Sequence, residues 1–127
     1  MKVEKCYCGS LNLFQRCCSP YIIGVLKAPT ALVLMKSRYS AYASHQADYL
    51  VATTHVSERK HYSKTEILHW AVSNSWKKLE ILYYSENTVE FKAYFLDENN
   101  NNQIHHELSN FKQENGIWFY LSGTFDL

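Results

Sequence analysis

Four cysteines are the residues whose type and spacing point most directly to chemistry. They are Cys6, Cys8, Cys17 and Cys18 in the pattern C-x-C-x8-C-C, and no cysteine follows in residues 19–127. A disulfide framework usually distributes its cysteines through a small secreted domain, whereas thiolates gathered in one segment suit Zn²⁺, which accepts four soft ligands in a tetrahedron. We therefore expect one structural zinc ion bound by all four, with no open position for catalysis. The alternative is four reduced thiols without a metal.

The segment around the cysteines contains residues that suit such a site. Gly9 can adopt the positive φ that lets the backbone turn back after Cys8. The stretch 9–16 is long enough for a short helical turn, and we expect three of its apolar residues to pack on the body of the protein: Leu11, Leu13 and Phe14. Three nearby cationic residues would offset the negative charge of four zinc-bound thiolates: Lys2, Lys5 and Arg16.

The composition is that of one compact domain. Of the 127 residues, 46% are hydrophobic and 20% charged, which excludes a disordered tail. The net charge of +1 gives no strongly basic surface, so DNA binding is not expected. No apolar run approaches the roughly 18 residues of a membrane span, and no hydrophobic signal core follows the N-terminus, so we expect a cytoplasmic protein without a membrane partner.

Helical patterns occupy the part of the chain that follows the cysteines, beyond an expected linker at 21–28. Pro29 and Thr30 suit a helix start, and apolar residues then recur at helical spacing: Leu32, Met35, Tyr39, Tyr42 and Ala43. A short second helix is expected over 47–54, with Tyr49 and Leu50 facing inward. The stretch 63–66 reads S-x-x-E, a capping box that predicts a third helix to about residue 75, with its apolar positions buried: Ile67, Leu68, Ala71 and Val72.

From Trp76 onward the apolar residues alternate with a period of two, which is typical of strands. Strands are expected over 76–84, 89–95, 104–111 and 117–124, and Asn115-Gly116 predicts a type I′ hairpin turn between the last two. Helices followed by an antiparallel meander indicate an α+β fold with the helices packed on one face of the sheet.

Several of these segments are similar to those of a known family. The stretch Cys6-Tyr7-Cys8-Gly9-Ser10, together with Cys17-Cys18-Ser19-Pro20-Tyr21, resembles the SEC-C zinc motif, best known from the C-terminal tail of the SecA translocation motor. Four later stretches resemble the YchJ-like family of uncharacterised bacterial proteins: 34–42, 48–55, 107–111 and 114–123. The resemblance implies a SEC-C-like zinc knuckle at 1–20 and a cone-shaped nuclear-transport-factor-2-like domain, with a curved antiparallel sheet, at 21–127.

The resemblance also bears on partners and metal content. It implies that the knuckle docks to a protein or to a ribosome-associated partner. Many members carry a second SEC-C motif at the C-terminus, whereas this sequence ends at Leu127, so one zinc per chain is expected. Domains of this type often pair through the open face of the sheet, and a homodimer would here use a row of alternating residues: Glu80, Leu82, Tyr84, Glu90, Lys92 and Tyr94.

A pocket between the helices and the curved sheet is expected in such a fold. The residues considered for it are Arg38, Tyr42, His55, Trp70, Trp76, His106, Glu107, Ser109 and Trp118, and the expected lining is Arg38, Tyr42, Trp70, Glu107, Ser109 and Trp118. If Arg38 faces inward it needs a carboxylate partner, and Glu107 is the natural one because it shares a strand face with Ser109. The alternative is an arginine that faces solvent.

Adjacent strand residues point to opposite faces, so His105 and His106 cannot bind one metal ion together. Two function classes remain. The first is a non-enzymatic binding module, because no catalytic motif is present. The second is a small-molecule enzyme, an isomerase or hydrolase, that uses Glu107 with His106 or Tyr42; fold alone gives weak support for this class.

Overall fold

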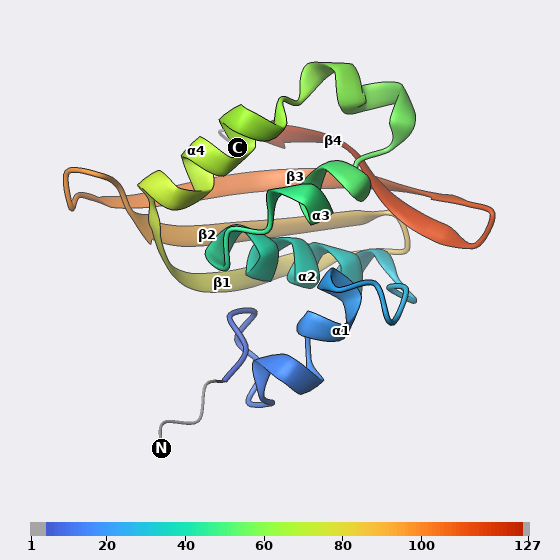
Figure 1. The fold of residues 1–127 in the computed structure, drawn as a ribbon, viewed down its shortest axis with the longest axis horizontal. Helices are drawn as coiled ribbons and strands as arrows, with labels where there is room; N and C mark the ends of the chain where they lie inside the picture. The colour runs from blue at the N-terminus through green and yellow to red at the C-terminus, as the bar shows by residue number, and fades with distance from the viewer. Residues whose placement is uncertain (1–4, 126–127) are drawn as a thin grey trace.

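The computed structural model describes residues 5–125, and it has the expected α+β arrangement of a helical layer on an antiparallel sheet (Figure 1). The helical elements are η1 (Phe14–Arg16), α1 (Ser19–Ile22), α2 (Ala31–Ala43), α3 (Ala47–Ala52), η2 (Val56–His61) and α4 (Lys64–Ser73). The strands are β1 (Ser75–Tyr84), β2 (Thr88–Leu96), β3 (Asn102–Glu114) and β4 (Ile117–Phe125). The sheet is an antiparallel meander in the order β1-β2-β3-β4, so each strand pairs with its neighbour in sequence.

Three predictions, two helix caps and one turn, are confirmed. The Thr30 side chain accepts a hydrogen bond from Val33 N at 3.1 Å and caps α2, and the Ser63 side chain accepts one from Glu66 N at 3.3 Å and caps α4. Asn115 and Gly116 have φ values of 53° and 80°, the positive angles that a type I′ turn requires.

Helix α2 is the centre of the molecule and is buried on more than one side. Met35 and Tyr39 contribute to the main core against the sheet, as their spacing predicted. Leu34, Ser40 and Ala41 are also buried, which the sequence pattern did not indicate. They are covered because α2 contacts α1 and α3 as well as the sheet, so the cysteine segment lies on one side of the helix and the sheet on the other (Figure 1).

Three parts of the helical layer differ from the sequence prediction. The expected linker at 21–28 begins inside α1, and η2 was not predicted because its segment VSERKH has no apolar periodicity. In α4 only Ala71 is fully buried, while Leu68 and Val72 are 37% and 51% exposed. The expected apolar face of α4 is thus largely open, because the helix contacts α2 and α3 and reaches over the sheet mainly through Trp70.

The outer face of the sheet is polar and makes its own cross-strand bonds. Tyr94 donates a hydrogen bond to Glu80 at 2.8 Å, and His106 pairs with Glu90 at 2.8 Å. Leu82 and Tyr84 are 44% and 59% exposed. A homodimer through this face stays a prediction. No helix within the described residues has the length and apolar character needed to cross a membrane.

Candidate functional site

The cysteine cluster is assembled by two short backbone turns. Gly9 has a φ of 94°, and its amide donates to the Cys6 carbonyl, which brings Cys8 next to Cys6. The 3₁₀ turn η1 then returns the chain to Cys17. The sulfur atoms of Cys6, Cys8, Cys17 and Cys18 all lie within 4.8 Å of one another, and those of Cys8 and Cys17 are 3.6 Å apart.

These distances fit a tetrahedral metal site. Zinc–sulfur bonds of about 2.3 Å place tetrahedral sulfur atoms about 3.8 Å apart. No ligating position is left for water when four thiolates bind, so such a site is structural. The residues present can therefore hold one metal ion, and zinc is the ion that this donor set suits best.

Hydrogen bonds between the sulfur atoms and burial change the pKa of three thiols in the cluster. A hydrogen bond from the Cys18 side chain holds the pKa of Cys6 far below its usual value, while the same contact, with burial, raises the pKa of Cys18. Burial also raises the pKa of Cys17. The Cys6 thiol thus loses its proton more readily than those of Cys17 and Cys18. A cation bound among four thiolates would offset the repulsion between their negative charges.

Two serines hydrogen-bond to the cluster from outside it. Ser10 lies 3.1 Å from the Cys17 sulfur, and Ser40 of α2 lies 3.5 Å from the Cys6 sulfur. Phe14 packs against the cysteine cluster, whereas it was expected to pack on the body. Leu11 is 82% exposed, so the prediction that Leu11 packs on the body is wrong. The cationic residues Lys5 and Arg16 are exposed, and Lys2 lies outside the described residues.

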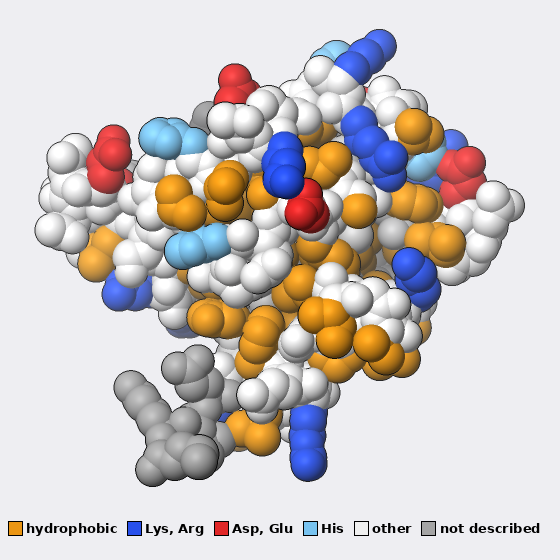
Figure 2. Space-filling view, viewed as in Figure 1, with side chains coloured by type: hydrophobic (Ala, Val, Ile, Leu, Met, Phe, Trp, Pro, Cys, Tyr) orange, Lys and Arg blue, Asp and Glu red, His pale blue; other side chains and the backbone are white. Residues whose placement is uncertain are grey.

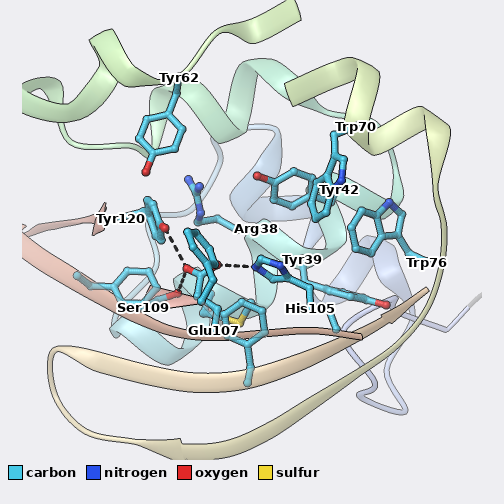
Figure 3. Close-up of a pocket in the computed structure, with 15 residues that line it drawn as sticks. Arg38, Tyr39, Tyr42, Tyr62, Trp70, Trp76, His105, Glu107, Ser109 and Tyr120 are labelled. Carbon is cyan, nitrogen blue, oxygen red and sulfur yellow. Dashed lines mark hydrogen bonds and ion pairs between the residues drawn. The ribbon is translucent and has the colours of Figure 1, made fainter. Parts of the chain in front are cut away.

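The second site is a cavity of about 180 Å³ between α2, α4 and the sheet (Figure 3). Most of its wall is aromatic, with Tyr39 and Tyr42 from α2, Trp70 from α4 and Trp76 from β1. Trp70 is the hub of this wall, because its ring makes edge contacts with Tyr42, Trp76 and Phe95 at 4.9–5.8 Å. Five of the six residues expected to line the pocket do line this cavity: Arg38, Tyr42, Trp70, Glu107 and Ser109. Trp76, which was also considered, lines it as well.

Glu107 is the polar centre of the cavity. Its carboxylate accepts hydrogen bonds from Tyr120 Oη at 2.9 Å, from Ser109 Oγ at 2.5 Å and from His105 Nε2 at 2.8 Å. The side chain fits because Gly123 lies directly under it: a Cβ at that position would come within 2.3 Å of Glu107 Oε2. Neither carboxylate oxygen is left without a donor.

Arg38 does not pair with Glu107, so that prediction is wrong. Its Nη1 instead donates to the Leu50 carbonyl at 2.9 Å and to Thr53 Oγ1 at 2.6 Å. The guanidinium lies over the Tyr120 ring, 4.5 Å from its centroid. Short backbone bonds between Tyr120 and the end of α3 hold this arrangement, since Tyr120 N donates to Thr53 O at 2.7 Å.

The histidines separate as strand geometry requires, but the one that reaches the cavity is His105. It lies two residues before Glu107 and shares its face, while His106 pairs with Glu90 on the outer face. The pairing of Glu107 with His106 considered for an enzyme is therefore excluded. The alternation that places Glu107 with Ser109 also places His105 with Glu107, and this signal was available in the sequence.

Two further candidates lie outside the cavity. Trp118 is buried near the β3–β4 turn, where α3 and the residues after α1 cover the sheet, so the expectation that it lines the pocket is wrong. His55 accepts a hydrogen bond from Ser57 N and contacts Glu114, which makes it a structural cap of η2. Tyr62 and Tyr120 were missed, because their inward orientation depends on packing between distant elements. Tyr39 was expected to face inward but was not assigned to the pocket, which it lines.

Burial also determines the ionisation of the tyrosines in the cavity wall. Burial raises the pKa of Tyr39 to about 12, and it raises the pKa of Tyr42 as well. Burial, together with the nearby Glu107 charge, raises the pKa of Tyr120. All three phenols are neutral at physiological pH, so they act as hydrogen-bond donors and apolar wall rather than as anions.

Comparison with known proteins identifies the family of this chain. Residues 30–123 match the family described as "YchJ, middle NTF2-like domain". A UPF0225 protein of Geobacter sulfurreducens is 35% identical over 125 residues, which are 93% of this chain and 77% of that protein. A UPF0225 protein of Photorhabdus laumondii is 37% identical over 128 residues, which are 95% of this chain and 80% of that protein.

Two solved structures share the fold. The solution structure of a SEC-C motif containing protein from Rhodopseudomonas palustris matches with a TM-score of 0.85 and 32% identity, covering 94% of this chain and 96% of that one. The crystal structure of a SEC-C motif containing protein from Psychrobacter arcticus matches with a TM-score of 0.78 and 32% identity, covering 94% and 76%. The expected similarity to SEC-C and YchJ-like proteins is confirmed.

Proposed function

The chain belongs to the YchJ family through its middle NTF2-like domain, and on this premise we propose that it is a zinc-stapled binding module for a small, largely apolar molecule. The cavity carries the proposal. A dry cavity of about 150 Å³ is large enough to bind benzene. The cavity here has about 180 Å³ and aromatic walls, so it has room for one six-membered ring and a small polar group.

The arrangement favours binding over catalysis by Glu107. A carboxylate that acts as a base needs an oxygen within reach of the proton it takes. Both Glu107 oxygens already accept hydrogen bonds from His105, Ser109 and Tyr120. The isomerase or hydrolase alternative would have to use a carboxylate that three hydrogen bonds already hold in place, whereas a fixed carboxylate suits a binding site whose shape is kept constant.

The metal part of the proposal is one structural zinc ion held by Cys6, Cys8, Cys17 and Cys18. The four sulfur atoms within 4.8 Å support it, as does similarity to SEC-C motif containing proteins. We propose the knuckle at 1–20 and the cone domain at 21–127 as the two functional parts. The knuckle side of α2 touches the cluster through Ser40, so the metal fixes the N-terminal segment against the helix that lines the cavity.

The test uses the three tryptophans as internal reporters. Trp70 and Trp76 line the cavity, whereas Trp118 does not. In two-dimensional NMR of the zinc-loaded full chain, titration with benzyl alcohol should shift the Trp70 and Trp76 indole N–H peaks saturably and leave the Trp118 peak in place. Equal small shifts of all three peaks, without saturation, would mean that the probe has no site in the cavity.

A second candidate function, docking to a protein partner, rests on exposed apolar side chains after the cluster. Ile23, Val25 and Leu26 are 70%, 71% and 50% exposed. Hydrophobic side chains gather over α1 and the segment that follows it (Figure 2). Contiguous exposed apolar residues mark interaction sites. A Val25→Ser variant should lose a cross-linked partner or ribosome co-sedimentation, while Val56→Ser, which changes an exposed valine of η2, should retain it; equal behaviour of the two variants counts against docking here.

A further inference from the structure

Arg38 is the charged group of the cavity whose hydrogen bonds are incomplete. Its side chain is held in place, because Nη1 donates to Leu50 O and Thr53 Oγ1 and the guanidinium stacks on Tyr120. The residue is only 8% exposed. Within residues 5–125, Nε and Nη2 donate to no acceptor, and no carboxylate forms an ion pair with the guanidinium.

These two nitrogens remain reachable from the cavity. Among the described residues, Trp118 Nε1 is the fully enclosed side-chain nitrogen that lacks a partner, so the free nitrogens of Arg38 are not sealed in the protein. Arg38 lines the cavity, and Figure 3 shows its guanidinium end between Tyr62 and Tyr120, facing the open space. A guanidinium presents its N–H groups as a planar fork that matches a carboxylate.

The other polar groups do not compete for the same ligand group. Glu107 already accepts three hydrogen bonds, two at Oε2 and one at Oε1, so most of its acceptor sites are taken by the protein itself. A buried cation without an anionic partner is costly, and an anionic ligand group removes that cost. At the end of the cavity formed by Arg38, Tyr62 and Tyr120, the charge that lacks an ion-pair partner among the described residues is positive.

The aromatic part of the cavity wall indicates what kind of molecule the carboxylate belongs to. Tyr42, Trp70 and Trp76 present ring faces and edges within 5.7 Å of one another, and such surfaces bind a flat apolar ring. We propose that the cavity binds a small monocarboxylate built on a single six-membered ring, with the carboxylate on Arg38 and the ring packed against the wall that these aromatic side chains form together. This inference rests on the proposed binding function and names the chemical class of its ligand.

The first experiment compares three probes that share one ring and differ in charge. Benzoate, benzyl alcohol and benzylammonium are titrated into the zinc-loaded full chain and followed by the Trp70 and Trp76 indole peaks. Because hydrogen bonds to charged groups are the stronger ones, benzoate should bind about tenfold or more tighter than benzyl alcohol. Benzylammonium should bind weakest, since it would place a second cation next to Arg38.

The second experiment removes the guanidinium and uses a matched arginine as the control. Arg38→Met should abolish the preference for benzoate while retaining benzyl alcohol binding. Arg59 also donates to two backbone carbonyls, Thr54 O at 2.9 Å and Ala52 O at 3.1 Å, but does not line the cavity. Arg59→Met should therefore leave all three affinities unchanged. If Arg38→Met fails to fold, the charge series on the wild-type chain still decides the question.

The outcomes separate this inference from the proposal on which it rests. Benzyl alcohol that binds as tightly as benzoate, or benzylammonium that binds tightest, overturns the carboxylate inference and leaves the binding function intact. A benzoate preference that survives Arg38→Met also overturns it. Failure of all three probes to reach saturation contradicts the binding function itself.

Discussion

The cysteine cluster and the aromatic cavity lie on different sides of α2 and are built in opposite ways. The cluster takes its four sulfur atoms from residues 6–18, joined by two turns, and touches α2 through Ser40. The cavity takes its polar groups from α2, β3 and β4, which meet only when the sheet has formed. A site whose ligands are close in sequence depends on the metal to hold it, whereas a site assembled from distant elements depends on the core. This difference implies that each site can be removed without the other.

Loss of one metal ligand tests this separation most strongly. Cys17→Ser should reduce the zinc content of purified protein from about one per chain to near zero, because three thiolates no longer close the tetrahedron. The far-UV circular dichroism of the cone domain should persist, since the main core contains none of the cysteines. Elemental analysis and circular dichroism on the same sample measure both.

Ser10→Ala is the matched control for that variant. It removes a hydrogen bond to the Cys17 sulfur but no metal ligand, so zinc content should remain near one per chain. A collapse of the dichroism signal when zinc is lost would show that the cone domain depends on the cluster, contrary to this account.

In the cavity, Glu107→Gln should lower the unfolding free energy by about 1–3 kcal/mol. The NH₂ group of the new amide would face a side chain that itself donates a hydrogen bond, so that bond would be lost. The bonds at stake come from His105, Ser109 and Tyr120. The matched control is Glu90→Gln, which changes the His106 partner on the outer face and should cost under about 1 kcal/mol.

Urea denaturation of the two variants measures the difference directly. A stabilised Glu107→Gln protein would mean that the carboxylate is held at a cost to stability, as in a catalytic site. That result would place the enzyme alternative first.

Gly123→Ala tests the packing beneath Glu107. A methyl group there would lie 2.3 Å from Glu107 Oε2 and 2.7 Å from Tyr120 Oη, so both the carboxylate and the phenol must move away from the methyl group. The expected loss of stability is about 1–3 kcal/mol, as for other overpacked sites. Ser122→Ala, one residue earlier in β4, should change stability by less than about 0.5 kcal/mol. Similar melting temperatures for both variants would contradict the close approach.

Alkaline pH should lower the stability of the folded protein gradually, because buried tyrosines of the cavity wall resist ionisation. An unfolded tyrosine ionises near pH 10, whereas burial raises the pKa of folded Tyr39 to about 12. The unfolded state thus releases its proton first, so this stability is complete below about pH 10 and falls as the pH rises toward 12. The urea midpoint measured through this range should fall less steeply in Tyr39→Phe; an unchanged slope would contradict the assignment.

The two sites also differ in how far the sequence predicts them. Features that depend on neighbours within a few residues formed as expected. They are the cluster made by the C-x-C and C-C spacings, the Thr30 cap and the Asn115-Gly116 turn. The α+β order of elements was likewise predicted from periodicity. The Arg38–Glu107 pair failed because the end of α3 supplies acceptors for Arg38, and no local pattern specifies that approach.

Strand register explains the other differences in the cavity. The alternation of side chains along β3 was sufficient to predict that His105, and not His106, faces the cavity with Glu107. The enzyme hypothesis that used His106 did not apply this alternation. Tyr120 could not be assigned in this way, because its contact with Glu107 depends on a register shift between β3 and β4 at Asn110 and Phe111. Such irregularities arise from packing and leave no signature in a single sequence.

The central claim is that the metal-bound cysteine cluster stabilises the N-terminal segment while the cavity separately binds a small molecule. Its most direct test compares the affinity for one probe with and without metal. Benzyl alcohol is titrated into zinc-loaded and chelator-treated protein, with the Trp70 and Trp76 indole peaks as reporters and Trp118 as the reference. Because the two sites share no side chain, the account predicts dissociation constants that agree within about twofold. Loss of saturable binding when zinc is removed, with the zinc-loaded protein still binding, would show that the cavity requires the metal and would contradict the account.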